Sequence, residues 1–95
     1  MADDPMLTVI AYDISSDRAR RYVAEILEEI GLRVQESVFE ARLSRTQSDG
    51  LARRLRKHVG EGDSIRFYPI AASRRERLLV LGTGVAAEDG PFLLF

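Results

Sequence analysis

One carboxylate in this chain has the position expected of a metal ligand. Asp13 directly follows Leu7–Tyr12, a short apolar run rich in β-forming residues that predicts a strand. A carboxylate at the end of a strand and before a helix can bind a hard cation such as Mg²⁺, which could activate water. One carboxylate is normally too few for Mg²⁺, so a twofold-related second copy of Asp13 would complete the site. Asp13 could equally end the strand as an ordinary loop residue. Tyr12 could orient water or substrate beside it, or simply pack within the strand.

The composition excludes several other kinds of site. The chain has no cysteine, which excludes disulfides, thiolate metal ligands and a thiol nucleophile. His58 is the only histidine, so one chain cannot form a histidine metal cluster, and we interpret this residue as structural or solvent-facing. Neither glycine-rich segment, 60–62 or 82–84, matches a phosphate-binding loop.

Basic residues are grouped in the middle of the chain. The net charge is −1, but residues 14–81 contain all 14 basic residues and 10 acidic ones, a net charge of +4. All the basic residues except Lys57 are arginine, whose planar guanidinium suits paired hydrogen bonds to phosphate. Arg53, Arg56 and Lys57 are predicted to share one helical face and to follow a phosphate backbone. Arg20 and Arg21, at the start of an earlier helix, and Arg33 are also predicted to bind nucleic acid. Solvated surface charge is the alternative.

Apolar periodicity predicts the elements that would position these residues. After the first strand, Ser15, Ser16 and Asp17 are candidate N-caps of a helix that reaches about Ile30. The apolar positions of Leu32–Leu43 change parity midway, which predicts two strands joined by a turn near 35–37.

The second half of the chain is predicted in the same way. Ser44 and Gln47 form a capping box at the start of a second helix, which Gly60 ends. The remaining predictions are a strand at 64–68 that ends at Pro69, a basic loop at 71–77 and a last short strand at 78–81.

The resulting order, β-α-β-β-α-β with an additional C-terminal strand, predicts a ferredoxin-like α+β fold. We expect one domain over residues 1–82 and a tail over 83–95. An apolar strand without a place in its own sheet would pair across a homodimer, through Leu78, Leu79, Val80 and Leu81. No apolar run approaches the roughly 20 residues that span a bilayer, and the acidic start is unlike a signal peptide, so a cytoplasmic protein is expected.

Four strings in the chain resemble one known family, the CRISPR-associated Cas2 proteins, over about residues 6–82. They are YDI at 12–14, RVQESVFE at 33–40, RFYP at 66–69 and LVLG at 79–82. The resemblance implies a homodimer that acts in CRISPR adaptation, where it bridges two dimers of the integrase partner, Cas1, and holds a short DNA duplex. Members of the family are also described as Mg²⁺-dependent endonucleases acting on RNA or DNA.

The resemblance also marks individual residues. It implies a metal-ligating role for Asp13, a phosphate contact for Arg20, and roles linked to activity for Arg33 and Phe39. Phe39 could instead pack in the core or in a dimer interface. Three functions therefore stay open: a DNA-holding scaffold, a metal-dependent endonuclease, and a ferredoxin-like RNA-binding or regulatory module without catalysis.

Overall fold

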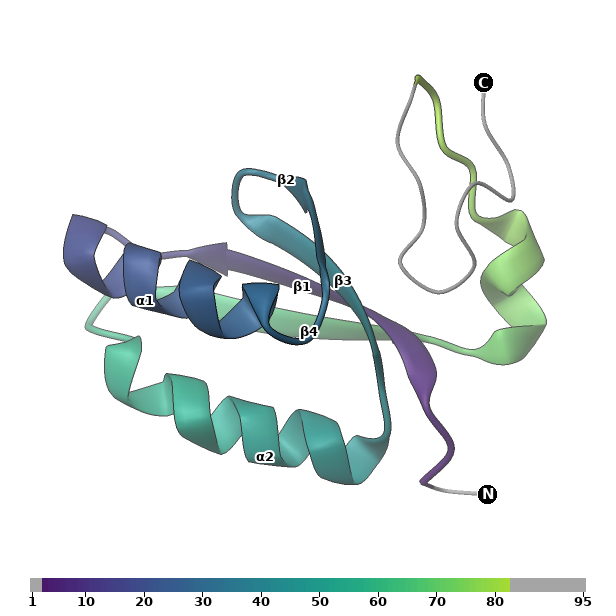
Figure 1. The fold of residues 1–95 in the computed structure, drawn as a ribbon, viewed down its shortest axis with the longest axis horizontal. Coiled ribbons are helices and arrows are strands. Elements are labelled where there is room, and N and C mark those ends of the chain that lie inside the picture. The colour runs from purple at the N-terminus through teal and green to yellow at the C-terminus, as the bar shows by residue number, and fades with distance from the viewer. Residues whose placement is uncertain (1–2, 83–95) are drawn as a thin grey trace.

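A computed structural model describes residues 3–82, which fold into a four-stranded antiparallel sheet with two helices on one face (Figure 1). In chain order the elements are β1 (Met6–Asp13), α1 (Asp17–Glu28), β2 (Leu32–Gln35), β3 (Val38–Leu43), α2 (Arg45–Leu55), the 3₁₀ turn η1 (Arg56–His58), β4 (Ser64–Ile70) and the 3₁₀ helix η2 (Ala72–Arg77). The sheet order is β2-β3-β1-β4. This is the ferredoxin-like α+β arrangement that the sequence predicts, with β2 and β4 at the edges.

Side chains of β1 alternate between the two faces of the sheet. Ile10 and Tyr12 point toward the helices and belong to the hydrophobic core, together with Phe39 of the neighbouring β3. Val9 and Asp13 therefore point to the opposite face, which neither α1 nor α2 covers. The sheet thus has a core face and an open face, and the side chains of adjacent residues in β1 point to different faces.

Both helices begin at the residues that the sequence predicts. Ser16 is the N-cap of α1, where its side chain accepts a hydrogen bond from the Ala19 N–H at 3.2 Å. The capping box of α2 is confirmed in both directions: the Gln47 N–H donates to the Ser44 hydroxyl at 3.1 Å, and the Ser44 N–H donates to the Gln47 amide oxygen at 2.8 Å. These caps fix where each helix leaves the sheet.

The hairpin β2–β3 contains the predicted change of phase. Its register shifts between Arg33 and Gln35, and Glu36 and Ser37 form the turn. The shift lets the apolar residues of β3 face the core, although the apolar residues of β2 occupy sequence positions of the other parity. The prediction of a turn near residues 35–37 is confirmed.

The C-terminal part differs from the prediction in three respects. β4 continues through Pro69 to Ile70, because it is an edge strand and an edge tolerates a residue without an N–H. The predicted basic loop contains a 3₁₀ helix, η2. The predicted strand at 78–81 is not formed within one chain: only Val80 has a bridge pairing, and Leu79 and Leu81 are 63% and 77% exposed.

The predicted tail, residues 83–95, lies outside the described residues. Among the helices that the structure does describe, none has the length and apolar character needed to cross a bilayer.

Candidate functional site

Asp13 ends β1 on the open face of the sheet and is exposed to solvent. Its cross-strand neighbour is Ser64, the first residue of β4. Within residues 3–82, no side chain or backbone group donates a hydrogen bond to its carboxylate, and no ion pair involves it. The carboxylate oxygens are therefore free to accept an external ligand.

One chain does not supply a complete metal site around this carboxylate. No group of three or more histidine, cysteine, aspartate or glutamate side chains is placed to hold a metal ion in the part of the chain that the structure describes. Asp13 fits Mg²⁺ as a hard oxygen ligand, and further ligands would have to come from a second chain, a substrate phosphate or water. Completion of the site by a second copy of Asp13 stays a prediction.

Tyr12 packs into the core, on the other side of the sheet from Asp13. The Tyr12 side chain is 4% exposed, stacks against Phe39 at 6.3 Å between ring centroids, and donates a hydrogen bond to the Glu36 carbonyl at 3.2 Å. Burial raises the pKa of its phenol, which makes the phenolate still less accessible near neutral pH. Strand alternation sends the ring into the core and Asp13 to the open face, as the alternative of packing within the strand predicts, and a catalytic role for Tyr12 stays a prediction.

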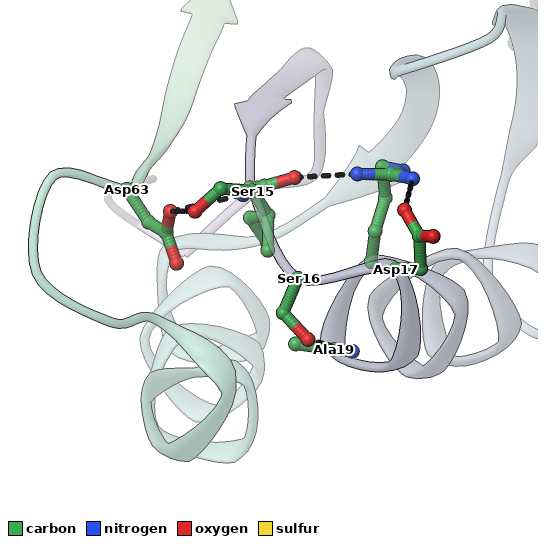
Figure 2. Close-up of polar contacts among 7 residues, drawn as sticks. Ser15, Ser16, Asp17, Ala19 and Asp63 are labelled. Carbon is green, nitrogen blue, oxygen red and sulfur yellow. Dashed lines mark hydrogen bonds and ion pairs between the residues drawn. The ribbon is translucent and has the colours of Figure 1, made fainter.

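The loop that follows Asp13 is held by a carboxylate that the sequence analysis did not single out. One oxygen of Asp63 accepts hydrogen bonds from the Ser15 N–H and the Ser15 hydroxyl, both at 3.0 Å (Figure 2). Its other oxygen accepts a hydrogen bond from the Gly60 N–H at 2.8 Å. Asp63 thus joins the β1–α1 loop to the turn before β4. These hydrogen bonds, led by the one from the Ser15 backbone, lower the pKa of Asp63. Ser15 and Asp63 are 48 residues apart, so no local pattern could have revealed the contact.

An Asp63→Ala variant should unfold at a lower temperature than the wild type at pH 7. Because folding lowers the pKa of Asp63, its contribution to stability is present above the pKa of the unfolded chain, near 4, and is lost as the pH falls through the folded value. The difference in Tm between wild type and variant should therefore shrink below about pH 4. Thermal unfolding followed by circular dichroism from pH 2 to 7 measures this, with Glu61→Gln as the exposed control. A difference in Tm that stays constant with pH would contradict it.

Arg20, a predicted nucleic-acid contact, holds the other side of the same loop. Its guanidinium donates to the Ile14 carbonyl at 2.8 Å and pairs with Asp17 in the first turn of α1 (Figure 2). The side chain is still 39% exposed, so phosphate contact stays a prediction for Arg20. Arg21, the next residue, is exposed on α1.

The Arg33 side chain makes most of its contacts within the β2–β3 hairpin. Its guanidinium donates twice to the Glu36 carbonyl, at 3.0 and 2.6 Å, approaches Glu28 at 3.4 Å and lies over the Phe39 ring at 5.5 Å. These contacts stabilise the turn and give Arg33 a structural position, while its predicted contact with nucleic acid stays untested. Phe39 itself is 0% exposed within one chain. The ring therefore packs in the core, which is the alternative that the sequence allowed, and its assignment to a dimer interface stays a prediction.

The basic residues of the second helical segment line two grooves. Arg53 and Arg56 line a groove of about 620 Å³ between α2 and β4, together with Asp49 and Phe67. Lys57, which lies in the 3₁₀ turn after Leu55, lines a second groove beside α1. The two grooves share Val59, and a continuous track of the three basic residues along a phosphate backbone stays a prediction.

Comparison with known proteins places this geometry in a family. The family model described as "CRISPR associated protein Cas2" matches residues 6–78. The chain belongs to the Cas2 family. Among similar proteins, "CRISPR-associated endoribonuclease Cas2 3" of Synechocystis is 53% identical over 66 residues, covering 68% of this chain and 72% of that protein. "CRISPR-associated endoribonuclease Cas2 3" of Chloroflexus aurantiacus is 41% identical over 85 residues, covering 88% and 91%.

Similar chains of known structure have the same fold. A Streptococcus pyogenes Cas2 crystal structure matches with a TM-score of 0.69 and 31% identity, covering 81% of this chain and 100% of that one. A Thermus thermophilus protein solved as hypothetical protein TT1823 matches with a TM-score of 0.67 and 40% identity, covering 72% and 84%. The resemblance that the four sequence strings suggest is therefore confirmed for both family and fold.

Proposed function

We propose that this Cas2-family chain acts in CRISPR adaptation as a homodimer that holds nucleic acid by its backbone and bridges the integrase partner, Cas1. We further propose that it cleaves RNA or DNA in a Mg²⁺-dependent reaction at Asp13. The observation that carries the proposal is the exposed Asp13 carboxylate, free of hydrogen bonds and ion pairs within residues 3–82, at the end of the central strand β1. The names of similar Cas2 proteins, which include endoribonucleases and an endonuclease, support hydrolysis of a phosphodiester.

The open face of the sheet and the segment after η2 support dimerisation. Val9 and Ala11 of β1 are only half-buried on that face, and Tyr68 of β4 is 48% exposed. Leu79 and Leu81 are more exposed still, on a segment with only one bridge pairing of its own. A twofold axis through such a surface repeats each residue, so a single carboxylate per chain becomes a pair in the assembly.

In the proposed reaction, bound Mg²⁺ supplies activation of water and stabilisation of the charge that develops on the phosphate. Asp13 holds the ion through its carboxylate oxygens, and the Asp63 and Arg20 contacts keep the loop behind Asp13 in place. Water forms the new bond to phosphorus while one phosphorus–oxygen ester bond breaks. The proton that the water loses is balanced by the one that the departing oxygen gains, and the products are a phosphate monoester and a hydroxyl.

The grooved surface beside α2 suits the scaffold role. Arg53 and Arg56 are both exposed and line the same groove, so they can contact successive phosphates without recognising bases. Arg54, the intervening arginine, pairs with Glu29 of α1 at 3.3 Å. The structure therefore separates two arginines that are available for phosphate from one that links the helices.

Nucleic-acid binding should weaken steeply with salt, and an Arg53→Ala, Arg56→Ala double variant should reduce that dependence. Each lost phosphate contact lowers the slope of log affinity against log salt by about one. Fluorescence anisotropy with a labelled 20-base-pair duplex at several salt concentrations measures the slope. Arg54→Ala is the matched control, and its slope should stay close to that of the wild type because Arg54 already has a partner. A salt-independent affinity would contradict the scaffold role.

A further inference from the structure

A second groove lies outside the Asp13 region and contains an aromatic stack. It has a volume of about 330 Å³ and lies between α1 and the segment 57–63, with Arg18, Tyr22, Lys57 and His58 in its lining. Tyr22 is 42% exposed although it is a large aromatic residue. Neither the core nor the proposed metal site uses these four side chains.

Three planar groups in this groove lie against one another. The Tyr22 and His58 rings stack with centroids 5.5 Å apart and an interplanar angle of 27°. The Arg18 guanidinium carbon lies 5.8 Å from the centroid of the Tyr22 ring. Stacked aromatic rings and guanidinium planes are the surfaces on which proteins hold unpaired nucleobases.

The charges around the stack favour a phosphate chain. Arg18 and Lys57 both line the groove, so cations accompany the rings. The acidic residue in the lining is Asp63, whose two oxygens already accept hydrogen bonds from Ser15 and Gly60. Asp63 stays negatively charged, but both of its oxygens are occupied by these donors, and the two cations of the lining outnumber it.

We propose that this groove binds one unpaired nucleobase of a single-stranded segment, with the flanking phosphates on Arg18 and Lys57. The proposal rests on the proposed function, since it assumes that the chain binds nucleic acid, and it adds a preference for unpaired bases. A base within a duplex is stacked on both faces by its neighbours, so only an unpaired base has a face available for Tyr22 and His58. A backbone track such as Arg53 and Arg56 has no such preference.

The test compares three labelled probes: a 12-nucleotide oligothymidylate, an abasic 12-mer with the same phosphates, and a blunt 12-base-pair duplex. Wild-type protein should bind the oligothymidylate more tightly than the abasic strand. Tyr22→Ala and His58→Ala should each weaken oligothymidylate binding by about 5- to 150-fold, the range for loss of one stacked base, and leave the abasic strand and duplex unchanged. Tyr22→Phe keeps the ring face and should retain the wild-type affinity. The two alanine variants should lose affinity for an oligouridylate probe to the same extent, because stacking does not require a particular sugar.

Two results would overturn the inference. Equal wild-type affinity for the oligothymidylate and the abasic strand would show that no base is held, whatever the variants do. An equal loss of affinity for all three probes in Tyr22→Ala and His58→Ala would show a role in general folding or charge. Either result leaves duplex binding by the wild type intact, whereas failure of every probe to bind would reject the proposed function as well.

Discussion

Replacing Asp13 by asparagine should reduce Mg²⁺-dependent cleavage of oligonucleotides by at least about a hundredfold, because a bound metal ion contributes several kcal/mol to the transition state and about 1.4 kcal/mol corresponds to a factor of ten. Asparagine keeps the size of the side chain and removes its charge. Asp13 is exposed and accepts no hydrogen bond from residues 3–82, so the folded structure should be unaffected. Cleavage of labelled RNA and DNA, measured as a function of Mg²⁺ concentration, gives the effect directly.

Glu61→Gln is the matched control for Asp13→Asn. Glu61 is also an exposed carboxylate, but it lies in the turn before β4 rather than at the end of β1. Its replacement should leave cleavage within about twofold of wild type. Undiminished cleavage by Asp13→Asn would remove this residue from any catalytic role. Measuring spacer acquisition with the same variant separates the two activities: acquisition without cleavage would assign the chain a scaffold role, and joint loss an enzymatic one.

Replacing Leu79 and Leu81 by aspartate should convert the proposed dimer into a monomer. Burying one leucine contributes roughly 1.5–3 kcal/mol, and the proposed twofold interface would bury four leucine side chains, two from each protomer. Losing that contribution and placing charges in the interface should raise the dissociation constant by more than about a thousandfold. Because both residues are 63% or more exposed within one chain, the monomer should keep its fold.

Analytical ultracentrifugation at micromolar concentration measures the mass, and circular dichroism checks the fold. The control is Ser73→Asp, which introduces one negative charge at an exposed position of η2 outside the proposed interface. A wild-type protein that is monomeric, or a double variant that stays dimeric, would contradict the proposed interface. Loss of the dimer should also abolish Mg²⁺-dependent cleavage if two copies of Asp13 share the ion.

The elements were predictable from the sequence where short-range rules decide them. The capping box of Ser44 and Gln47 and the change of parity before β3 depend on residues within a few positions, and both are confirmed. The prediction that the last strand ends at Pro69 was wrong. Whether proline ends a strand depends on whether that strand is central or at an edge, which is a property of the whole sheet.

The candidate site was predictable only in part, for the same reason. Asp13 could be found because it follows an obvious strand, but the face on which Tyr12 points depends on where the helices pack. The Asp63 contact with Ser15 joins residues 48 apart, and the Tyr22–His58 stack joins two different elements. Neither contact could be predicted from local composition or residue spacing.

The alternation of Tyr12 and Asp13 along β1 has a consequence for folding. If β1 paired with β3 and β4 one position out of register, the carboxylate would enter the space beside Phe39 and the phenol ring would be exposed to water. Burying an unpaired carboxylate costs several kcal/mol, so such a misaligned sheet would be strongly disfavoured. The residue proposed for chemistry on the open face thus also discriminates against misfolded pairings of the central strand.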